Sequence, residues 1–386
     1  MYEDRTRGLF LDWTRPHDCA PINDTEGNCI KKIAFISGPA LGHVGRLYEI
    51  AKKLVRRADV EITFYIADYT TTAEMVIGNA FRIKKIPIPA ETRHHPFEAF
   101  ADGIEKCFQH DNVELIVHDG CPLRWLSTTR FPDCPRVFVT NAFLTGHHNR
   151  DTFQSRWFDK PVHMKINHLR AEKGLPAISS PFELYDADKV ILADARFLIP
   201  RASQFPEHFH FCGPIHWGSR GEIPESIANL TDHCIISMGS TGKRNIEREL
   251  LARLRSMTGC EKFIYAGRQA SDVKNAGLIE YAFEWLPLDQ LYSHAGFAVT
   301  QGGSGSTYQA IAKGVPSLTF PTHINQEIFG NILEKAGLSV CIGLNDNLEK
   351  IENFDIDSLR DAARGASLKM SGNGAIRAAK HLIEMI

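Results

Sequence analysis

Two residues that could carry out acid–base chemistry each follow an apolar run. His43 lies in the segment 38–45, between the run 31–37 and a helix predicted from Leu47, and Asp119 comes two residues after the run 115–117. A near-neutral imidazole can take a proton from a hydroxyl group, and a carboxylate can orient that imidazole and stabilise its charged form. The carboxyl ends of parallel strands meet at one edge of a sheet, so we expect His43 and Asp119 to lie there as a His–Asp dyad, with His43 as the general base. The alternatives are a helix-start histidine bonded to backbone and an aspartate that caps a helix.

A second chemical feature is a glycine loop between the apolar run 297–300 and an alanine-rich, helix-like run that ends at Lys313. The loop consists of Gln301, Gly302, Gly303, Ser304, Gly305, Ser306 and Thr307. Its glycines allow close approach of the backbone to a ligand, and Ser306 and Thr307 are good N-caps for the following helix. Free amides and the positive end of a helix dipole favour a phosphate group. We therefore expect a nucleotide diphosphate here; the alternative is a purely structural turn.

Length and composition limit the other possibilities. The chain has 386 residues, which suits two domains, and its net charge of −2 does not favour nucleic acid as a partner. No stretch reaches the ~18 apolar residues of a membrane span, and the charged N-terminus lacks a signal-peptide core. The nine cysteines are scattered without a C-x-x-C pair, so we expect reduced thiols, no metal site and a cytoplasmic location.

The elements that must position these residues follow an alternating order. Short apolar runs predict buried strands, and the periodic segments between them predict helices, so a parallel sheet with helices on both faces is expected. The first set of strands is predicted at 31–37, 61–66, 81–87, 115–117, 136–140, 189–192 and 209–212, with 81–87 at an edge. The turn-rich segment 213–221 reads as a linker. A second set then follows at 234–238, 262–266, 278–283, 297–300 and 318–321.

Several short motifs fall on this framework at a specific spacing. They are Gly42-His43-Val44, Gly213-Pro214, Met238-Gly239-Ser240, Trp285-Leu286-Pro287, the loop 302–307, Gly314-Val315-Pro316 and Asn325-Gln326. Together they resemble the signature of the inverting nucleotide-sugar glycosyltransferases of the UDP-glycosyltransferase superfamily. The resemblance covers most of residues 31–340 and leaves out 1–30.

The resemblance implies an α/β architecture of the GT-B type, with two Rossmann-like domains facing a central cleft. We predict an irregular extension over 1–30, an acceptor domain over 31–215, a nucleotide-sugar domain over 216–365, and a C-terminal helix over 366–386 that crosses back to the first domain. The implied partners are a nucleotide-sugar donor, as co-substrate, and a small-molecule acceptor. No metal, cofactor, nucleic acid or integral membrane segment is expected, and a homodimer is compatible with the sequence.

The family also implies roles for individual residues. Trp285 would stack on the nucleobase, although a tryptophan in this setting can also be a buried core residue. The remaining donor-site residues are predicted to be Ser240, Arg268, Gln301, Gly302, Gly303, Ser304, Gly305, Ser306, Thr307, Gln309, Asn325 and Gln326. On the acceptor side we predict Arg46, together with Phe143 and His147 from the aromatic, histidine-rich segment 141–158.

Four positions depart from the family pattern. Members usually have histidine beside the pyrophosphate where this chain has Gln301, glutamate on the ribose where it has Gln309, and aspartate on the sugar hydroxyls where it has Asn325. Three charged or titratable groups are thus replaced by amides, which can still form hydrogen bonds. Arg46 stands where a proline is usual. It could pair with an anionic acceptor or a phosphate, and the alternative is a solvated helix arginine.

These residues predict an inverting glycosyltransferase that transfers a sugar from a UDP- or dTDP-sugar to a hydroxyl group of a small molecule such as a natural product. One rival keeps the fold and acts at a membrane on a lipid-linked acceptor. Another is a catalytically weak nucleotide-sugar-binding auxiliary protein, because three charged donor residues are absent. An epimerase is a third alternative, although it would need more carboxylates.

Overall fold

The computed structural model describes residues 30–69, 71–93, 96–119, 123–149, 160–185, 187–218, 221–239, 244–370 and 372–386. The chain divides into two units, and the second, Lys31–Ile386, is compact. The extension predicted over 1–30 lies outside the described residues apart from Ile30.

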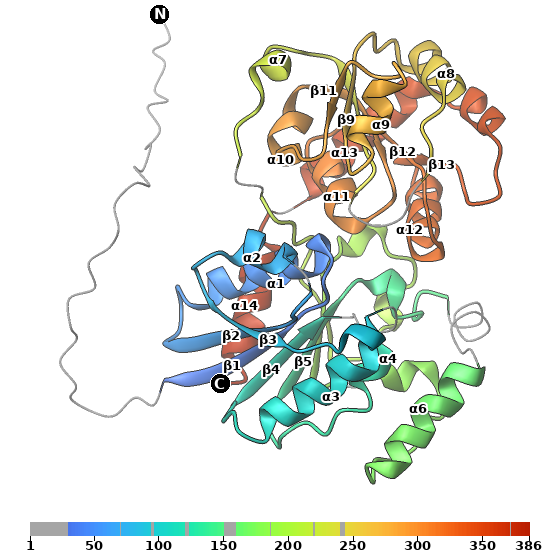
Figure 1. The fold of residues 1–386 in the computed structure, drawn as a ribbon. Coiled ribbons are helices and arrows are strands. Elements are labelled where there is room, and N and C mark those ends of the chain that lie inside the picture. The colour runs from blue at the N-terminus through green and yellow to red at the C-terminus, as the bar shows by residue number, and fades with distance from the viewer. Residues whose placement is uncertain are drawn as a thin grey trace, which may run out of the picture. The chain divides into compact units, whose positions relative to one another are not determined.

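The first half of this unit is built on a parallel sheet of seven described strands, in the order β3-β2-β1-β4-β5-β6-β7 (Figure 1). The strands are β1 (Lys31–Ile36), β2 (Val60–Ala67), β3 (Arg82–Ile86), β4 (Leu115–Asp119), β5 (Arg136–Thr140), β6 (Lys189–Leu192) and β7 (Phe209–Phe211). The helices among them are α1 (Leu41–Leu54), α2 (Thr72–Ile77), α3 (Phe97–Phe108), α4 (Leu123–Leu126) and α6 (Lys160–Glu172). The predicted edge strand is confirmed as β3.

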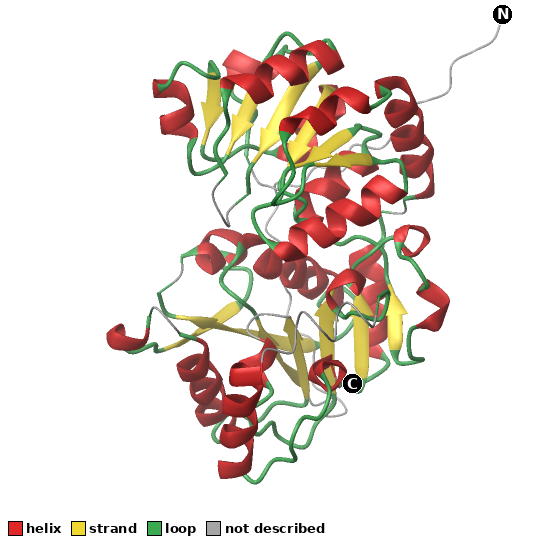
Figure 2. Ribbon diagram, turned by 90° about the vertical axis from the view of Figure 1, so that its right-hand side faces the viewer, coloured by secondary structure: helices red, strands yellow, loops and turns green. Residues whose placement is uncertain are grey.

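Both faces of this sheet are buried, which explains why its strands are continuous apolar runs in the sequence. Successive side chains of β1 alternate between two cores. Ile33 and Phe35 pack with α1 and α2 on one face, whereas Ala34 and Ile36 pack with α3 on the other. Figure 2 shows helices on both sides of the sheet.

The second half repeats this plan with a parallel sheet of six described strands, in the order β10-β9-β8-β11-β12-β13. The strands are β8 (His233–Ser237), β9 (Phe263–Ala266), β10 (Tyr281–Phe283), β11 (Ala295–Thr300), β12 (Ser317–Thr319) and β13 (Ser339–Cys341). The helices are α7 (Glu225–Ala228), α8 (Arg248–Thr258), α9 (Ala270–Asn275), α10 (Leu288–Leu291), α11 (Ser304–Ala312), α12 (Ile324–Lys335) and α13 (Ile356–Lys369). Strand β10 is shorter than the predicted 278–283.

The chain ends with a helix, α14 (Gly374–Ile383), that packs on α1 of the first half (Figure 1). Ala378, Ala379 and Leu382 enter the same core as β1 and α1. Gly374 starts the helix where a Cβ atom would lie 2.3 Å from the carbonyl oxygen of Pro214 in the linker. The predicted return of the C-terminus to the first domain is therefore confirmed, although the helix predicted over 366–386 is two helices, with α13 ending at Lys369.

In each sheet the strand order reverses at one point, between β1 and β4 and between β8 and β11. Ligands of open α/β sheets bind beyond the carboxyl ends of the strands at such points. The registers align these ends, because Ile36 of β1 pairs with His118 of β4, and Thr300 of β11 pairs with Ser237 of β8. The segments that follow β1, β4, β8 and β11 are therefore placed to form a site. In the described part of the chain, no helix is both long and apolar enough to span a bilayer.

Candidate active site

The base side of the site is assembled from α1 and β4. The helix begins at Leu41, six residues earlier than the apolar pattern from Leu47 predicts, so His43 and Arg46 both lie in its first two turns. Residues three apart share a helix face, and this face meets the end of β4. His43 Nδ1 contacts Asp119 Oδ1, and Arg46 Nη2 donates to Asp119 Oδ2 at 2.6 Å. The Nδ1 atom of the His43 ring is therefore bonded to a side chain.

Asp119 is a fully buried carboxylate with the His43 ring on one oxygen and the charged Arg46 guanidinium on the other. Burial alone would raise its pKa, but His43 and Arg46 outweigh burial and hold the pKa of Asp119 well below its usual range. The carboxylate therefore accepts from both partners, and we assign the ring proton of neutral His43 to Nδ1. This leaves Nε2 of His43, whose side chain is 30% exposed, able to accept a proton.

Arg46 is buried, with 6% of its surface exposed, so the alternative of a solvated helix arginine is wrong. Besides the bond to Asp119, its Nη1 donates to Asn141 Oδ1 at 2.7 Å. Asn141 follows β5 directly, and its Nδ2 donates to Asp194 Oδ1 at 2.9 Å. The guanidinium thus joins the ends of β4 and β5, and the predicted contact with an acceptor stays a prediction.

The glycine loop connects β11 to α11, and one of its glycines is required by the backbone. Gly302 has a φ of 79°, and a Cβ atom there would lie 2.7 Å from the Gln326 carbonyl oxygen. A Cβ atom at Gly303 or Gly305 would meet nothing within 4 Å, so open space lies beside the loop at these positions. The loop can therefore hold its own backbone against α12 and still leave room for a ligand.

Helix α11 begins at Ser304 with Gly303 as N-cap, so the prediction that Ser306 and Thr307 cap it is wrong. Those residues lie in its first turn, and the Thr307 amide donates to the Gly303 carbonyl oxygen at 3.2 Å, so the helix leaves the amides before Thr307 without a partner of its own. The Thr307 hydroxyl is buried and bonds Thr300 Oγ1 at 2.9 Å. Thr307 therefore ties the helix to β11, whereas Ser304 and Ser306 are half-buried at the amide-rich end.

Some side-chain amide atoms of the predicted donor site have hydrogen-bond partners, and others have none among the described residues. Gln326 uses its carbonyl to accept from Thr322 and its Nε2 to donate to Gln301 Oε1 at 3.3 Å. In contrast, Gln301 Nε2 and Asn325 Oδ1 are buried and have no partner among the described residues. Buried polar atoms are normally satisfied, so these two atoms mark places where a ligand or water would bind.

The region around Trp285 contains a second tryptophan that the sequence reasoning missed. Trp285 is 40% exposed, so it is not a core residue, and its ring lies 5.3 Å from that of Trp217 in the linker. The Trp217 carbonyl oxygen accepts from Gln309 Nε2 at 3.0 Å, so the predicted ribose ligand already has a partner. Arg268 is exposed just after β9. Ser240 lies outside the described residues.

A hydrogen bond connects the residues around Asp119 to the donor loop. The Ser304 hydroxyl donates to Asn141 Oδ1 at 3.1 Å, and the same oxygen accepts from Arg46. Asn141 and Asp194 were missed by the sequence reasoning, although both come within two residues of a strand's carboxyl end. The rule that found Asp119 could have found them too.

The two aromatic-segment residues predicted to bind the acceptor are both buried. The Phe143 ring stacks on Phe329 of α12 at 4.6 Å. The His147 ring packs against Phe182, 5.0 Å away, and Phe209, 4.9 Å away. The structure therefore brings together the predicted base and donor loop but places these two rings in apolar packing, and their contact with an acceptor is untested.

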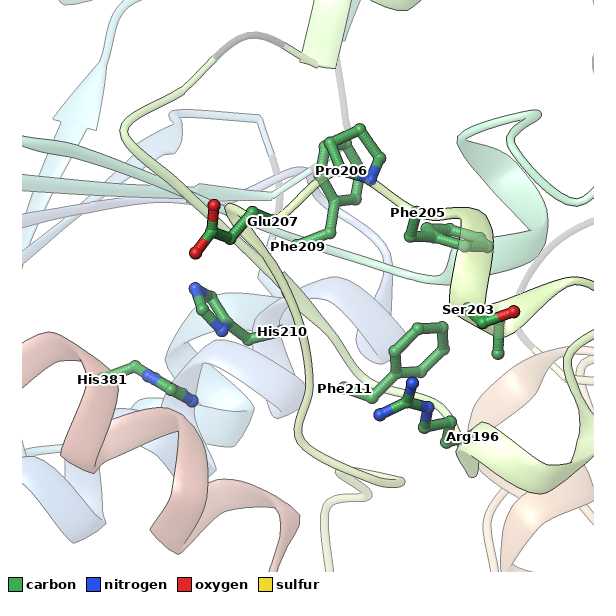
Figure 3. A pocket seen from close by; sticks show the side chains of 10 residues that line it. Arg196, Ser203, Phe205, Pro206, Glu207, Phe209, His210, Phe211 and His381 are labelled. Carbon is green, nitrogen blue, oxygen red and sulfur yellow. The ribbon is translucent and has the colours of Figure 1, made fainter.

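A pocket of about 350 Å³ lies elsewhere, beside β7 and α14 (Figure 3). The rings of His210 and His381 stack there at 4.4 Å, with Arg196 and Phe205 among the other lining residues. None of the predicted site residues lines this pocket, so we place the candidate site at the strand ends instead. Within the described ranges, no group of three histidine, cysteine or acidic residues is arranged to hold a metal ion.

Comparison with known sequences gives distant relatives. No protein-family model matches the chain. It is 28% identical over 184 residues to the PGL/p-HBAD biosynthesis glycosyltransferase of Mycobacterium tuberculosis, and this match covers 46% of the chain and 42% of that relative. The chain thus spans less than half the length of the relative it matches. It is also 21% identical over 366 residues to the NDP-glycosyltransferase YjiC of Bacillus subtilis, covering 87% of the chain and 88% of YjiC.

Solved structures share the whole architecture at low identity. The glycotransferase of kitacinnamycin matches 93% of this chain and 100% of its own, with a TM-score of 0.69 and 16% identity. CalG4, the calicheamicin glycosyltransferase, matches 92% and 98%, with a TM-score of 0.67 and 20% identity. LpCGTa, solved in complex with UDP, matches 92% and 99%, with a TM-score of 0.63 and 16% identity. With the two parallel sheets, these likenesses confirm the predicted architecture.

Proposed function

The chain has a UDP-glycosyltransferase-like GT-B fold, and from that premise we propose that it transfers a sugar from a UDP- or dTDP-sugar to a hydroxyl group of a small molecule. The single observation that carries the proposal is the bond from Ser304 in the donor loop to Asn141 in the base network. This bond supports a general base and a diphosphate site that lie next to each other, as transfer requires.

In the proposed reaction, His43 Nε2 takes the proton of the acceptor hydroxyl. The acceptor oxygen forms a bond to the anomeric carbon from the face opposite the nucleotide, and the bond from that carbon to the diphosphate oxygen breaks. The electron pair leaves with the diphosphate, so configuration inverts. Asp119 stabilises the imidazolium that forms at His43, because its ionised carboxylate contacts Nδ1.

The leaving diphosphate is proposed to lie at the first turn of α11. Negative charge develops there as the bond breaks, and preorganised amides with the positive helix end stabilise it. Gln301 Nε2 would donate to the diphosphate and Asn325 Oδ1 would accept from a sugar hydroxyl, since both atoms lack partners among the described residues. Trp285 would cover the nucleobase. We accordingly propose that 31–215 receives the acceptor and 216–365 holds the donor.

The acceptor is proposed to be a small natural product. Two structural neighbours are named as glycosyltransferases of kitacinnamycin and calicheamicin, and this supports that class over a polymer. A second function is favoured by one contact, because Gln309 is already bound to the Trp217 carbonyl oxygen. If that bond persists, the ribose lacks one ligand, and the protein would bind a nucleotide sugar as an auxiliary protein with little turnover.

Nucleotide binding and nucleotide release test these alternatives in sequence. We expect UDP or dTDP, but not GDP, to raise the melting temperature of the full chain, and the matching nucleotide sugar to release nucleotide slowly to water and faster with a phenolic acceptor. Binding without release, with any acceptor, would support the auxiliary protein. Release only with vesicles that contain a lipid-linked acceptor would move the acceptor to that class. If the chain neither binds UDP or dTDP nor releases nucleotide, the proposal is refuted.

A further inference from the structure

Asp194 is a buried carboxylate that the proposed chemistry does not use. It lies two residues after β6 and is fully buried, with no positive side chain bonded to it in the described structure. Its Oδ1 accepts from Asn141 Nδ2 and from the Tyr308 hydroxyl, both at 2.9 Å, and its Oδ2 accepts from the Ala142 amide. Burial raises the pKa of Asp194, and these three hydrogen bonds oppose the rise. A buried carboxylate is costly, so this one calls for a role.

Asn141 links this carboxylate to the base. Its Oδ1 accepts from Arg46 and from Ser304, and its Nδ2 donates to Asp194, so the orientation of the amide is determined by its partners. A flipped amide would point its NH₂ group at the Arg46 guanidinium. The amide therefore connects Asp194 through Arg46 to Asp119 and His43.

Tyr308 links the same carboxylate to the donor loop. It lies on α11 four residues after Ser304, and residues four apart share a helix face. Ser304 therefore reaches Asn141 and Tyr308 reaches Asp194 from the same side of the helix. The Tyr308 ring also packs 5.1 Å from Phe329, so its hydroxyl is held at a buried position.

We propose that Asp194 is a positioning residue that couples the base to the donor helix, holding Asn141 with one bond and Tyr308 with the other. This inference rests on the function proposed above. Apolar packing such as the Phe143–Phe329 stack can hold α12 near η2 (Ala142–Leu144), but it has little directional preference. The hydrogen bonds to Asp194 have direction, so they determine where the amide end of α11 lies relative to His43.

Two tyrosine variants test the hydrogen bond between Asp194 and the donor helix α11. Tyr308→Phe removes only the hydroxyl that Asp194 accepts from. Tyr292→Phe is the matched control, because Tyr292 is equally buried and its hydroxyl has no hydrogen-bond partner among the described residues. We expect Tyr308→Phe to raise the KM for UDP-glucose or dTDP-glucose about tenfold, as loss of one bond to a charged group implies, with the pH profile of kcat unchanged. Tyr292→Phe should leave both unchanged.

A double-mutant cycle tests the coupling itself. Arg46→Lys keeps the charge but cannot reach Asp119 and Asn141 together. We express kcat/KM of each variant relative to wild type. If Asp194 couples the base to the donor helix, this ratio for the double variant Tyr308→Phe with Arg46→Lys will exceed the product of the two single-variant ratios. Asp194→Asn is a second variant, and we expect it to lower kcat/KM at least as much as Tyr308→Phe.

Three outcomes are decisive. An active wild type with strictly multiplicative effects, or with Tyr308→Phe equal to Tyr292→Phe, would overturn the coupling and leave the proposed function standing. An active wild type with non-multiplicative effects would support both. A wild type that neither binds UDP or dTDP nor releases nucleotide would overturn the function and the coupling together.

Discussion

The base side and the donor side of the site differ in how their buried polar groups are partnered. We define the base side as His43, Arg46, Asp119 and Asn141, and the donor side as Gln301, Ser304, Gln309, Asn325 and Gln326. On the base side, each charged group has an opposite charge or an amide within hydrogen-bonding distance, and Arg46 Nε is the one buried side-chain atom there that lacks a partner among the described residues. On the donor side no residue carries charge, and two buried amide atoms lack partners there.

The difference indicates which half is organised before substrate arrives. A buried ion pair is strongly destabilised when one partner is removed, so the base side can keep its geometry without a ligand. A neutral amide that lacks a partner costs less and can be satisfied by a ligand that binds there. We infer that the base side is preorganised and that the donor side is completed by the nucleotide sugar. The predictions below test this comparison, from the largest expected effect to the smallest.

The largest effect is expected for His43→Ala. Loss of a general base lowers kcat by roughly 10²- to 10⁴-fold, whereas donor affinity should be unchanged because the His43 ring contacts Asp119 and not a donor-side residue. Nucleotide release and calorimetric binding of the same nucleotide measure the two quantities. The control is His168→Ala, which removes an exposed histidine on α6. Equal loss of binding and turnover in His43→Ala would contradict the role of His43 as the base.

The second prediction concerns the stability of the base side. Asp119→Asn leaves Arg46 buried without its ionised partner, and such losses cost about 3–5 kcal/mol in the free energy of unfolding. Asp111→Asn is the control, because Asp111 also accepts from a cation, Lys84, but that pair is partly exposed and should cost about 1 kcal/mol or less. Urea unfolding of both variants measures the difference. Equal costs would mean that the base side is no more preorganised than the surface.

Much of the fold could be read from the sequence for a physical reason. Parallel strands buried on both faces are continuous apolar runs. A glycine- and serine-rich segment between such a run and a helical pattern indicates a strand–loop–helix unit, as found at α11. Helix starts were less accurate. Gly42 and Gly45 favoured a loop before α1, and the serines of the donor loop were predicted as caps when the helix already begins at Ser304.

The charged network was predicted only in part, because its members are far apart in the chain. Arg46 and Asn141 are separated by 95 residues, and Asp194 and Tyr308 by 114. No spacing rule connects such positions, and only the strand register brings them together. Arg46 illustrates the limit: its position on the helix face was legible, but its burial depends on β4 and β5, which lie far along the chain.

The third prediction separates His118 from its neighbour Asp119 on β4. The His118 ring lies between Phe131 and Phe138, and burial, with Arg136 nearby, lowers its pKa from 6.5 to about 3. Between these values the unfolded chain binds a proton that the folded chain does not, so stability falls as the pH drops. Between pH 6.5 and 4, the wild type should lose roughly 3 kcal/mol more of its free energy of unfolding than His118→Phe does. Parallel pH–stability curves for wild type and variant would refute this.

The smallest effect on stability is expected at the donor side, in Gln301→Met. The side chain makes one 3.3 Å hydrogen bond, from Gln326, and its Nε2 lacks a partner among the described residues, so unfolding should change by about 1 kcal/mol or less. Nucleotide affinity, in contrast, should fall about tenfold, because the ligand loses a donor. Urea unfolding and calorimetry on one protein preparation measure both. A stability loss as large as that of Asp119→Asn, with unchanged affinity, would mean that the donor side is preorganised too, and the contrast between the two sides would fail.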